Sequence, residues 1–221
     1  MQVKVKRRLL RVSLKDLEDG KPEVIPLQVP EGFRVNGSKY IFKTKPFAHQ
    51  MAALRRTQAL GGGALFMEQG TGKTAVAIHF IGLKYLEEGC GKVLVICPMS
   101  AMGVWVKEIR KHLPDDLRRG ARVVRLYGTR TRRTKKIGRL IANSRGSGLN
   151  ICIINHESSW RLEEWLVRFA PETVIVDESH RIKSPKAKQS KAAWRLGRKA
   201  KYHLILTGTP IVGGAHDVWS Q

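Results

Sequence analysis

Short runs rich in Val, Ile, Leu and Cys recur along most of the chain and alternate with longer stretches of helix-forming residues. The runs lie at residues 64–67, 92–97, 123–127, 149–154, 173–176 and 201–206. Runs of this length without polar alternation are typical of strands that are buried on both faces of a sheet. The stretches between them predict helices at residues 49–60, 75–81, 104–113 and 157–169. This alternation indicates an α/β fold with a doubly wound, mostly parallel sheet and helices on both faces.

The first 45 residues follow a different pattern. Prolines at positions 22, 26 and 30 precede residues 33–42, which alternate between apolar and polar side chains around Asn36-Gly37. Asn-Gly between alternating segments is the strongest short signal for a β-hairpin. We therefore predict a small β-rich appendage over residues 1–45 and a larger domain over residues 46–221.

The charge of the chain indicates what kind of partner it binds. Forty-one Lys and Arg stand against 18 Asp and Glu, which gives a formal net charge of +23. Such an excess indicates a polyanionic partner, and nucleic acid is the simplest one. No apolar run approaches the roughly 18 residues of a membrane span, and the basic N-terminus lacks the apolar region of a signal peptide. These features argue against a membrane partner and favour an intracellular protein, cytoplasmic or in the nucleoid if the source is a prokaryote or a phage.

The cysteines predict neither disulfides nor a metal site. Cys90, Cys97 and Cys152 are odd in number and widely spaced, and two of them fall in apolar runs. We therefore expect reduced residues in the core. The sequence has no CxxC pair and no His/Cys spacing that would indicate zinc.

A glycine-rich loop follows the first apolar run of the larger domain. Residues 69–74 read Gln-Gly-Thr-Gly-Lys-Thr, and a helical stretch begins at Ala75. Strand, glycine loop and helix are the context of a phosphate-binding loop, in which glycines let backbone N–H groups surround the phosphates. The lysine reaches the β/γ-phosphates, the threonine ligates Mg²⁺, and the positive end of the helix dipole points at the phosphates. The candidate nucleotide-binding residues are Gln69, Gly70, Thr71, Gly72, Lys73 and Thr74.

An acidic pair ends another apolar run. Asp177 and Glu178 follow residues 174–176, so we expect them at the carboxyl end of a strand, where open α/β sheets bind their ligands. There Asp177 can hold Mg²⁺, directly or through water, while Glu178 orients and deprotonates the attacking water. With Lys73 as the charge on the phosphates, these residues predict a magnesium-dependent nucleoside triphosphate hydrolase.

The order of the motifs resembles that of the first RecA-like lobe of superfamily-two helicases, most closely the Swi/Snf-type DNA translocases. Matching segments lie at residues 97–100, 153–157, 177–188, 206–210 and 217–220. The most specific is residues 177–188, where Asp-Glu-Ser-His is followed by Arg-Ile-Lys-Ser-Pro and further lysines. The resemblance implies a RecA-like fold, ATP and Mg²⁺ as ligands and DNA as partner. Departures from the family pattern are Met67, which replaces the first loop glycine, and Gly213-Gly214, where many relatives carry an asparagine.

The resemblance also implies roles for residues outside the two motifs. Gln50 lies where the family places its adenine-reading glutamine, although the usual Arg-Pro-Tyr-Gln is Phe-Ala-His-Gln here. Ser100, which is in position to cap the helix predicted after it, belongs to a segment that touches the DNA backbone in the family. The threonines that match Thr207 and Thr209, on either side of Gly208, are thought to pass the state of the γ-phosphate to the DNA side.

Two basic segments are candidates for nucleic-acid contact. One follows the acidic motif directly, and the other spans residues 130–136, which are equally compatible with the solvated face of a helix. The candidate residues are Lys183, Lys186, Lys188, Arg132 and Arg133. No aromatic residue lies among the lysines, so we expect contacts to the DNA backbone that tolerate sequence and weaken with salt.

In the resembling family a second RecA-like lobe follows residues of the kind seen at 206–210. That lobe carries an arginine finger, and such fingers are worth roughly 10³–10⁵ in turnover. We therefore expect a polypeptide of these 221 residues to bind ATP weakly and to bind DNA. It should hydrolyse ATP very slowly unless a second lobe is supplied in cis or in trans.

Three functions fit the sequence. The first is the ATP-binding lobe of a DNA-dependent ATPase that translocates on or remodels duplex DNA. The second is the motor lobe of an RNA helicase or a restriction-type translocase, and residues 181–185 argue against the RNA helicase. The third is a nucleic-acid-binding regulatory module whose ATP site only switches conformation, and the presence of Lys73, Asp177 and Glu178 argues against it.

Overall fold

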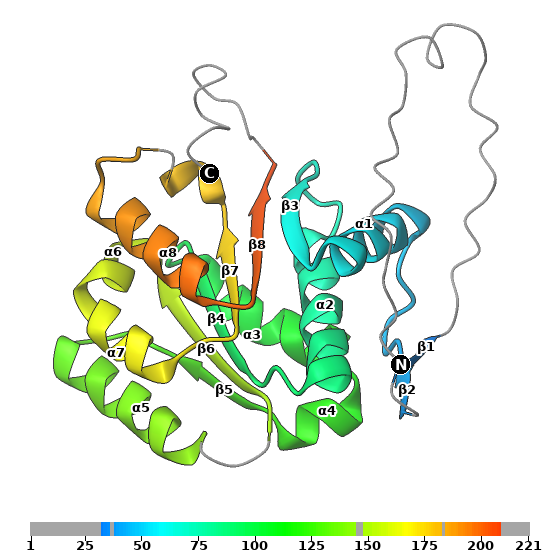
Figure 1. Ribbon diagram of the computed structural model, residues 1–221, viewed down its shortest axis with the longest axis horizontal. Coiled ribbons are helices and arrows are strands. Elements are labelled where there is room, and N and C mark those ends of the chain that lie inside the picture. Colours follow the sequence, from blue (N-terminus) through cyan, green and yellow to red (C-terminus); the bar gives the residue numbers. More distant parts are fainter. Residues whose placement is uncertain (1–31, 36–37, 145–147, 183, 209–221) are drawn as a thin grey trace, which may run out of the picture.

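A parallel sheet of six strands, in the order β3-β8-β7-β4-β6-β5, forms the centre of the fold (Figure 1). The computed structural model describes residues 32–35, 38–144, 148–182 and 184–208. Every pairing between neighbouring strands of this sheet is parallel. The strands are β3 (Gly62–Phe66), β4 (Lys92–Cys97), β5 (Arg122–Arg125), β6 (Asn150–Asn155), β7 (Thr173–Asp177) and β8 (Tyr202–Thr207). Each overlaps an apolar run of the sequence, so the predicted doubly wound α/β sheet is confirmed.

Helices cover both faces of the sheet, as predicted (Figure 1). One face carries α1 (Ala48–Leu60), α2 (Lys73–Glu88), α3 (Ala101–His112) and α4 (Asp115–Gly120). The other face carries α5 (Arg130–Asn143), α6 (His156–Ser159), η2 (Trp160–Leu162), α7 (Glu163–Phe169) and α8 (Lys188–Lys199), and the single turn η3 (Ser179–Ile182) follows β7. In the described part of the chain, none of these helices has the length and apolar character needed to cross a membrane.

Two separate apolar clusters fill the space between the sheet and its helices, because side chains alternate along each strand. In β4, Val93 and Val95 pack with α1, α2 and α3. Leu94 and Ile96 point to the opposite face and pack with α5, α7 and α8. A strand that is buried on both faces needs apolar residues at every position, which explains the continuous apolar runs in the sequence.

All three cysteines are buried free thiols, in agreement with the sequence-based prediction. Burial raises the pKa of the Cys97 and Cys152 thiols far above the ordinary value. Both therefore stay protonated and behave as small apolar core residues.

The single helix predicted at residues 157–169 is wrong, because the chain forms α6, η2 and α7 there. Ser159 donates its hydroxyl to the carbonyl of His156 at 2.7 Å, a local bond by which serine competes with the helical backbone. Leu162, which precedes α7, has φ −116° and ψ 15° and so leaves the helical region. Residues 160–162 therefore form a 3-10 turn between two short helices.

Ser100 does not cap α3 in the expected way. It occupies the N-cap position, but its backbone is helical, with φ −62° and ψ −34°, and its side chain forms no capping hydrogen bond. A capping serine is normally extended, so that its hydroxyl can accept from the N–H groups of the first turn. The helices α4 and α8 are further additions to the predicted set.

The antiparallel pair predicted near the N-terminus is present as β1 (Gly32–Val35) and β2 (Ser38–Ile41). It packs against α2. The hydroxyl of Tyr40 lies 3.0 Å from Nδ1 of His79. A Cβ atom at Gly82 would lie 2.7 Å from Cε2 of Tyr40, so the glycine allows β2 to approach α2 closely. A domain boundary at residue 45 stays a prediction.

His79 should make the stability of this contact depend on pH. Its buried ring packs edge-on against Phe42, with ring centroids 4.8 Å apart. Burial, helped by nearby His112, lowers the pKa of His79 from 6.5 to about 4. The unfolded chain takes up this proton below about pH 6.5 and the folded chain only near pH 4. The free energy of unfolding should therefore fall by roughly 3 kcal/mol as the pH drops through that window.

Urea unfolding at several pH values between 7 and about 4.5 measures this decline. Other groups titrate in the same range, so the informative quantity is the difference in slope between the wild type and His79→Phe. The exposed His203 on β8 offers a matched control, His203→Phe, which should keep the wild-type slope. An unchanged slope in His79→Phe would contradict the prediction.

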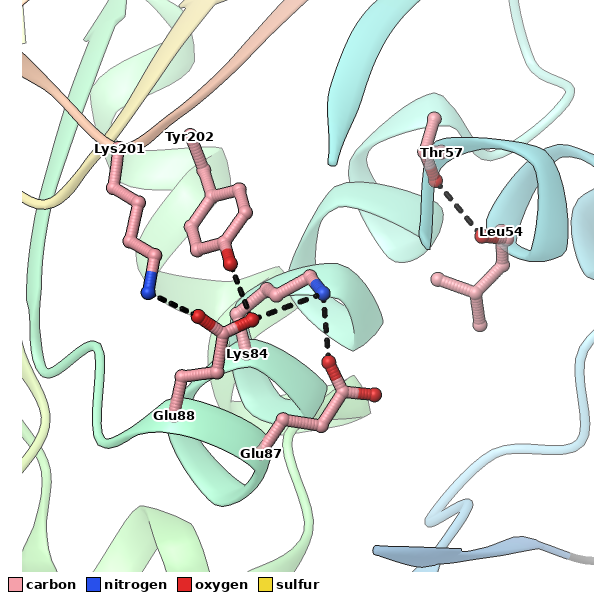
Figure 2. A network of polar contacts seen from close by, with 7 residues as sticks. All are labelled: Leu54, Thr57, Lys84, Glu87, Glu88, Lys201 and Tyr202. Atoms are coloured by element: carbon pink, nitrogen blue, oxygen red, sulfur yellow. Dashed lines mark hydrogen bonds and ion pairs between the residues drawn. The ribbon is translucent and has the colours of Figure 1, made fainter. Parts of the chain in front are cut away.

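A network of charged side chains joins the last turn of α2 to the start of β8 (Figure 2). This end of α2 lies opposite the carboxyl ends of the strands. Nζ of Lys84 lies 2.7 Å from Glu87 Oε2 and 3.5 Å from Glu88 Oε1. Glu88 also accepts hydrogen bonds from the Tyr202 hydroxyl and the Lys201 ammonium at the start of β8. The network joins the last turn of α2 to the sheet, and so fixes the helix whose other end carries the glycine-rich loop.

Candidate functional site

The carboxyl ends of β3, β8 and β7, which are neighbours in the sheet, lie side by side. The register pairs Phe66 with Thr207 and Leu206 with Asp177, so the three strands end at nearly the same level. The glycine-rich loop follows β3, the acidic pair ends β7, and Thr207 ends β8. Motifs far apart in the sequence are thus brought to one edge, where open α/β sheets bind ligands.

The glycine-rich loop folds as a compact turn over the start of α2. Gly70 and Gly72 have φ of 79° and 85°, in the left-handed region that favours glycine. Thr71 donates its hydroxyl to the carbonyl of Glu68 at 2.6 Å, which closes the turn. Because α2 begins at Lys73, the N–H groups of its first turn and the positive end of its dipole face the loop. This geometry suits an anionic ligand such as phosphate.

Lys73 lies inside the loop and is 9% exposed. Its ammonium donates to the carbonyls of Met67 at 2.8 Å and Glu68 at 2.9 Å. Gly208, which follows β8, lies close to this ammonium: a Cβ atom added at Gly208 would be 3.5 Å from it. The same Cβ atom would be 3.2 Å from Cγ of Gln69, which is exposed. One positive charge is therefore held between the phosphate loop and the end of β8.

Gln50 joins α1 to the phosphate loop. Its Nε2 donates to the carbonyl of Thr71 at 2.9 Å, and its Oε1 accepts from the N–H of Phe47 at 3.0 Å. Nε2 of His49 lies 3.0 Å from the same Thr71 carbonyl. A Cβ at Gly72 would lie 2.2 Å from Nε2 of Gln50. Gln50 thus lies against the loop, and its amide fixes the loop backbone in this structure.

Asp177 is held by a tryptophan on α3. Its Oδ2 accepts from Nε1 of Trp105 on α3 at 2.8 Å, and its Oδ1 accepts from the N–H of Glu178 at 3.0 Å. Burial raises the pKa of the Asp177 carboxyl, while the Trp105 hydrogen bond and the charge of Lys73 act in the opposite direction. Nothing in the sequence connects Trp105 with Asp177, because 72 residues separate them. Trp105 is a positioning residue that sequence reasoning missed.

Glu178 adopts a left-handed backbone, with φ of 50°. This conformation is uncommon outside glycine and costs about 1–2 kcal/mol. Oε2 of Glu178 lies 3.2 Å from Nδ1 of His180, and Nδ1 of His180 lies 3.2 Å from Oγ1 of Thr207. His180 therefore connects the acidic pair on β7 with the end of β8. Thr209, the second predicted coupling threonine, lies outside the described residues.

A second histidine, His156, contacts the end of β7 that carries the acidic pair. His156 is fully buried at the start of α6, and its Nε2 lies 2.9 Å from the carbonyl oxygen of Asp177. Burial lowers the pKa of His156 to about 4. The ring is therefore neutral near pH 7, and its Nε2–H donates to that carbonyl. His156 and Asp177 are 21 residues apart in the sequence, so the sequence pattern does not connect them.

The candidate nucleic-acid residues follow the same edge, because α3, α5 and α8 all begin there. Ser100, Lys186 and Lys188 are exposed, and Lys183 lies outside the described residues. Nζ of Lys188 lies 4.9 Å from the ring centroid of Trp160, so an aromatic residue that is remote in sequence does lie among these lysines. On α5, Arg132 is exposed, whereas Arg133 donates to the hydroxyl of Ser158 on α6.

The oxygen ligands at this edge are few. Among the described residues, no group of three or more His, Cys, Asp or Glu side chains is arranged to hold a metal ion. Asp177 supplies a buried carboxylate, and Thr74 supplies a hydroxyl in the first turn of α2. Mg²⁺ usually takes one or two protein oxygens and completes its shell with water and substrate phosphate. The residues present therefore fit Mg²⁺ that arrives with a nucleotide.

A parallel sheet with a phosphate loop after one strand and an acidic pair after another defines the class of phosphate-loop nucleotide-binding proteins. Within that class, the family model described as the SNF2-related domain matches residues 48–220. The chain belongs to this family, which confirms the resemblance to Swi/Snf-type ATPases.

The names of two similar proteins refer to DNA repair and to chromatin remodelling. The chain is 30% identical over 237 residues to the DNA excision repair protein ERCC-6 of Homo sapiens, an alignment that covers 97% of this chain and 15% of that protein. It is 31% identical over 159 residues to the ISWI chromatin-remodeling complex ATPase ISW1 of Saccharomyces cerevisiae, covering 72% of this chain and 13% of that protein. The chain thus spans only a small part of the length of these relatives.

A solved structure shares the fold. The Sulfolobus solfataricus SWI2/SNF2 ATPase core in complex with dsDNA matches with a TM-score of 0.61 and 22% identity, over 87% of this chain and 36% of that one. The similarity confirms the predicted RecA-like fold.

Proposed function

We propose that the chain is the ATP-binding lobe of a DNA-dependent ATPase that translocates on or remodels duplex DNA. The observation that carries this proposal is the meeting of phosphate loop, acidic pair and Thr207 at the ends of three adjacent strands. Membership of the SNF2-related family supports it, as does the similarity to a repair protein and a chromatin-remodeling ATPase. The chain would act inside the cell, where its DNA partner lies. Residues 46–221 would form the ATP-binding domain, and residues 1–45 the appendage.

The triphosphate of ATP would bind against the loop N–H groups and the first turn of α2. Lys73 would neutralise the β/γ-phosphates, and Gln50, beside the loop, is the candidate for adenine recognition. Thr74 and Asp177 would hold Mg²⁺, which neutralises charge that develops on the phosphates. Glu178 would accept a proton from the attacking water, so that the water oxygen can bond to the γ-phosphorus as the bond to ADP breaks.

His180 provides a route from this chemistry to DNA. It lies within 3.2 Å of both Glu178 Oε2 and Thr207 Oγ1. A change in the hydrogen bonding of Glu178 on loss of the γ-phosphate would therefore alter the contacts of Thr207 at the end of β8. Thr207, Gly208 and Thr209 are the residues that would pass this change to the DNA side.

DNA would bind across the edge where α3, α5 and α8 begin. Ser100, Lys186, Lys188 and Arg132 are exposed there, and Lys183 and Arg133 are further candidates. Contacts of lysine and arginine with phosphates release counterions, so binding should tolerate sequence and weaken steeply with salt. A second RecA-like lobe, in cis or in trans, would complete the site with an arginine finger.

Three measurements test the proposal: the affinity for nucleotide, the affinity for duplex DNA and the rate of ATP turnover. The variant Lys73→Ala serves as the negative control for nucleotide binding and turnover. A fluorescent ATP analogue with Mg²⁺ should bind the wild type, and Lys73→Ala should lower its affinity by at least about tenfold through loss of a charge-assisted hydrogen bond. Both proteins should bind duplex DNA equally. Turnover should be very slow for the 221 residues alone and should rise with duplex DNA once a second lobe is present.

Each outcome bears on a different part of the proposal. Equal stimulation by duplex RNA of the same sequence would contradict the DNA assignment. Fast hydrolysis by the 221-residue chain alone would contradict the need for a second lobe. Nucleotide binding without hydrolysis under all of these conditions would favour the regulatory module.

A further inference from the structure

The outer edge of the sheet is formed by β5 in the part of the chain that the structure describes. A groove of about 750 Å³ runs along this edge, between α3 on one face of the sheet and α5 on the other. The groove is separate from the phosphate loop and the acidic pair, and none of the residues proposed for ATP or DNA lines it. An unpaired strand edge that is flanked by two helices is a natural place for another strand to add.

The backbone of β5 offers both donors and acceptors to this groove. The N–H of Arg122 donates to Leu149 at 2.7 Å, and the N–H of Leu126 donates to Ile153 at 2.8 Å, both toward β6. In a parallel pair successive residues alternate in the direction of their backbone groups. Val123 and Arg125 therefore turn their N–H and C=O groups toward the groove. Nζ of Lys136 donates to the Arg125 carbonyl at 3.2 Å, and ladder positions remain at Val123 and at the Arg125 N–H.

The walls of the groove are strongly basic. Lysine and arginine side chains reach it from all three elements: Lys107, Arg110, Arg122, Arg125, Lys136 and Arg139. No Asp or Glu is among the residues that line it, and no described carboxylate forms an ion pair with any of these cations. Like charges this close repel one another, so a negatively charged occupant would be favoured.

We propose that the β5 edge is a docking site for an extended acidic segment of a partner protein, which adds as a further strand of the sheet. In an added strand, successive side chains point to opposite faces. Carboxylates would therefore meet Lys107 and Arg110 on the α3 side and Lys136 and Arg139 on the α5 side. Backbone hydrogen bonds would supply affinity and the cations would supply specificity for acidic sequences. This site is independent of the function proposed above.

The chemistry of the groove favours a peptide over nucleic acid. Its floor includes Val106, Val123 and Leu140, which suit apolar side chains that alternate with the carboxylates. Phosphate oxygens only accept hydrogen bonds, so a nucleic-acid backbone would leave the outward carbonyl of Val123 without a donor. A peptide backbone carries both kinds of group. A glycine at position 103 also leaves room, because a Cβ there would lie 3.3 Å from Nη1 of Arg125.

The test uses a labelled peptide with Glu-Glu-Val-Val repeats, which presents carboxylates and apolar side chains on each face of a strand. We expect saturable binding by fluorescence anisotropy, together with slower hydrogen exchange at the Val123 and Arg125 amides. A Lys-Lys-Val-Val peptide should not bind. The same acidic peptide with proline at the valine positions should bind far more weakly, because it lacks N–H donors for the ladder.

Charge reversal distinguishes the groove from general attraction to a basic protein. Lys107→Glu with Arg139→Glu should weaken peptide binding by at least about tenfold. The control pair Lys111→Glu with Lys135→Glu makes the same charge change at exposed positions of α3 and α5 outside the groove. Only a small, salt-sensitive effect is expected from it.

Two results would overturn the proposal. One is equal weakening by the two variant pairs, with no protection of the β5 amides. The other is protection of those amides by duplex or single-stranded DNA in place of the peptide, which would make the groove a nucleic-acid site. Hydrogen exchange is measured on the wild-type protein, so the second result does not depend on the folding of any variant.

Discussion

A Glu178→Gln variant should bind ATP and duplex DNA like the wild type, while its DNA-stimulated turnover falls by about 10²–10⁴-fold. The amide keeps the size of the carboxylate but cannot accept a proton from the attacking water. Binding should survive, because the phosphate contacts come from the loop, from Lys73 and from the first turn of α2. The variant should therefore stop the cycle after ATP binding.

The backbone of Glu178 supports its assignment as the proton acceptor. Among the described residues, only Ala170 and Glu178 have positive φ without being glycine. Such residues persist where their surroundings hold them, often at functional sites. Here the N–H of Glu178 is bound by the Asp177 carboxylate at 3.0 Å, and the side chain lies 3.2 Å from His180. These contacts keep the carboxylate at the edge of the sheet beside the phosphate loop.

Phosphate release with a second lobe and duplex DNA present measures the loss, and a fluorescent ATP analogue measures binding. Glu163→Gln is the matched control, since it removes a carboxylate that pairs with Arg195 on the far face of the sheet. Turnover within about threefold of the wild type in Glu178→Gln, far short of the loss of about 10²–10⁴-fold expected for a lost general base, would show that another group takes the proton.

The strands could be predicted because the burial of each strand determines its own pattern of apolar residues. A strand covered on both faces, such as β4 or β6, is apolar at every position, and this pattern needs no knowledge of its neighbours. The phosphate loop and the acidic pair could also be predicted, because each is recognised from a few consecutive residues. The loop is recognised by its glycines, and the acidic pair by its place at the end of a strand. Parallel connections then bring the carboxyl ends of the strands to one edge.

The supporting contacts could not be predicted, because they join residues that are remote in sequence. Trp105 on α3 donates to the Asp177 carboxylate, and His156 contacts the carbonyl of the same residue. Trp160 lies under Lys188 in the same way, although no aromatic lies among the lysines in sequence. Hydrophobic periodicity carries no information on such pairs.

Gly72→Ala should lower the free energy of unfolding by roughly 2–3 kcal/mol and weaken ATP binding by more than about tenfold. The left-handed backbone at φ 85° disfavours any residue with a Cβ. The new methyl would also lie 2.2 Å from Nε2 of Gln50, so the amide would have to leave the Thr71 carbonyl that it contacts at 2.9 Å. A displaced loop would no longer direct its N–H groups at the phosphates.

Gly70→Ala separates the two causes, because its φ is 79° and a Cβ there meets nothing within 4 Å. It should show the conformational cost of about 1–2 kcal/mol alone. In a Gln50→Ala background the contact is removed, so the further cost of Gly72→Ala should fall to the Gly70→Ala level. Urea unfolding of the four combinations at positions 50 and 72 gives the coupling energy. A value within about 0.5 kcal/mol of zero would mean that the two residues act independently, and that Gly72 is required for its backbone conformation only.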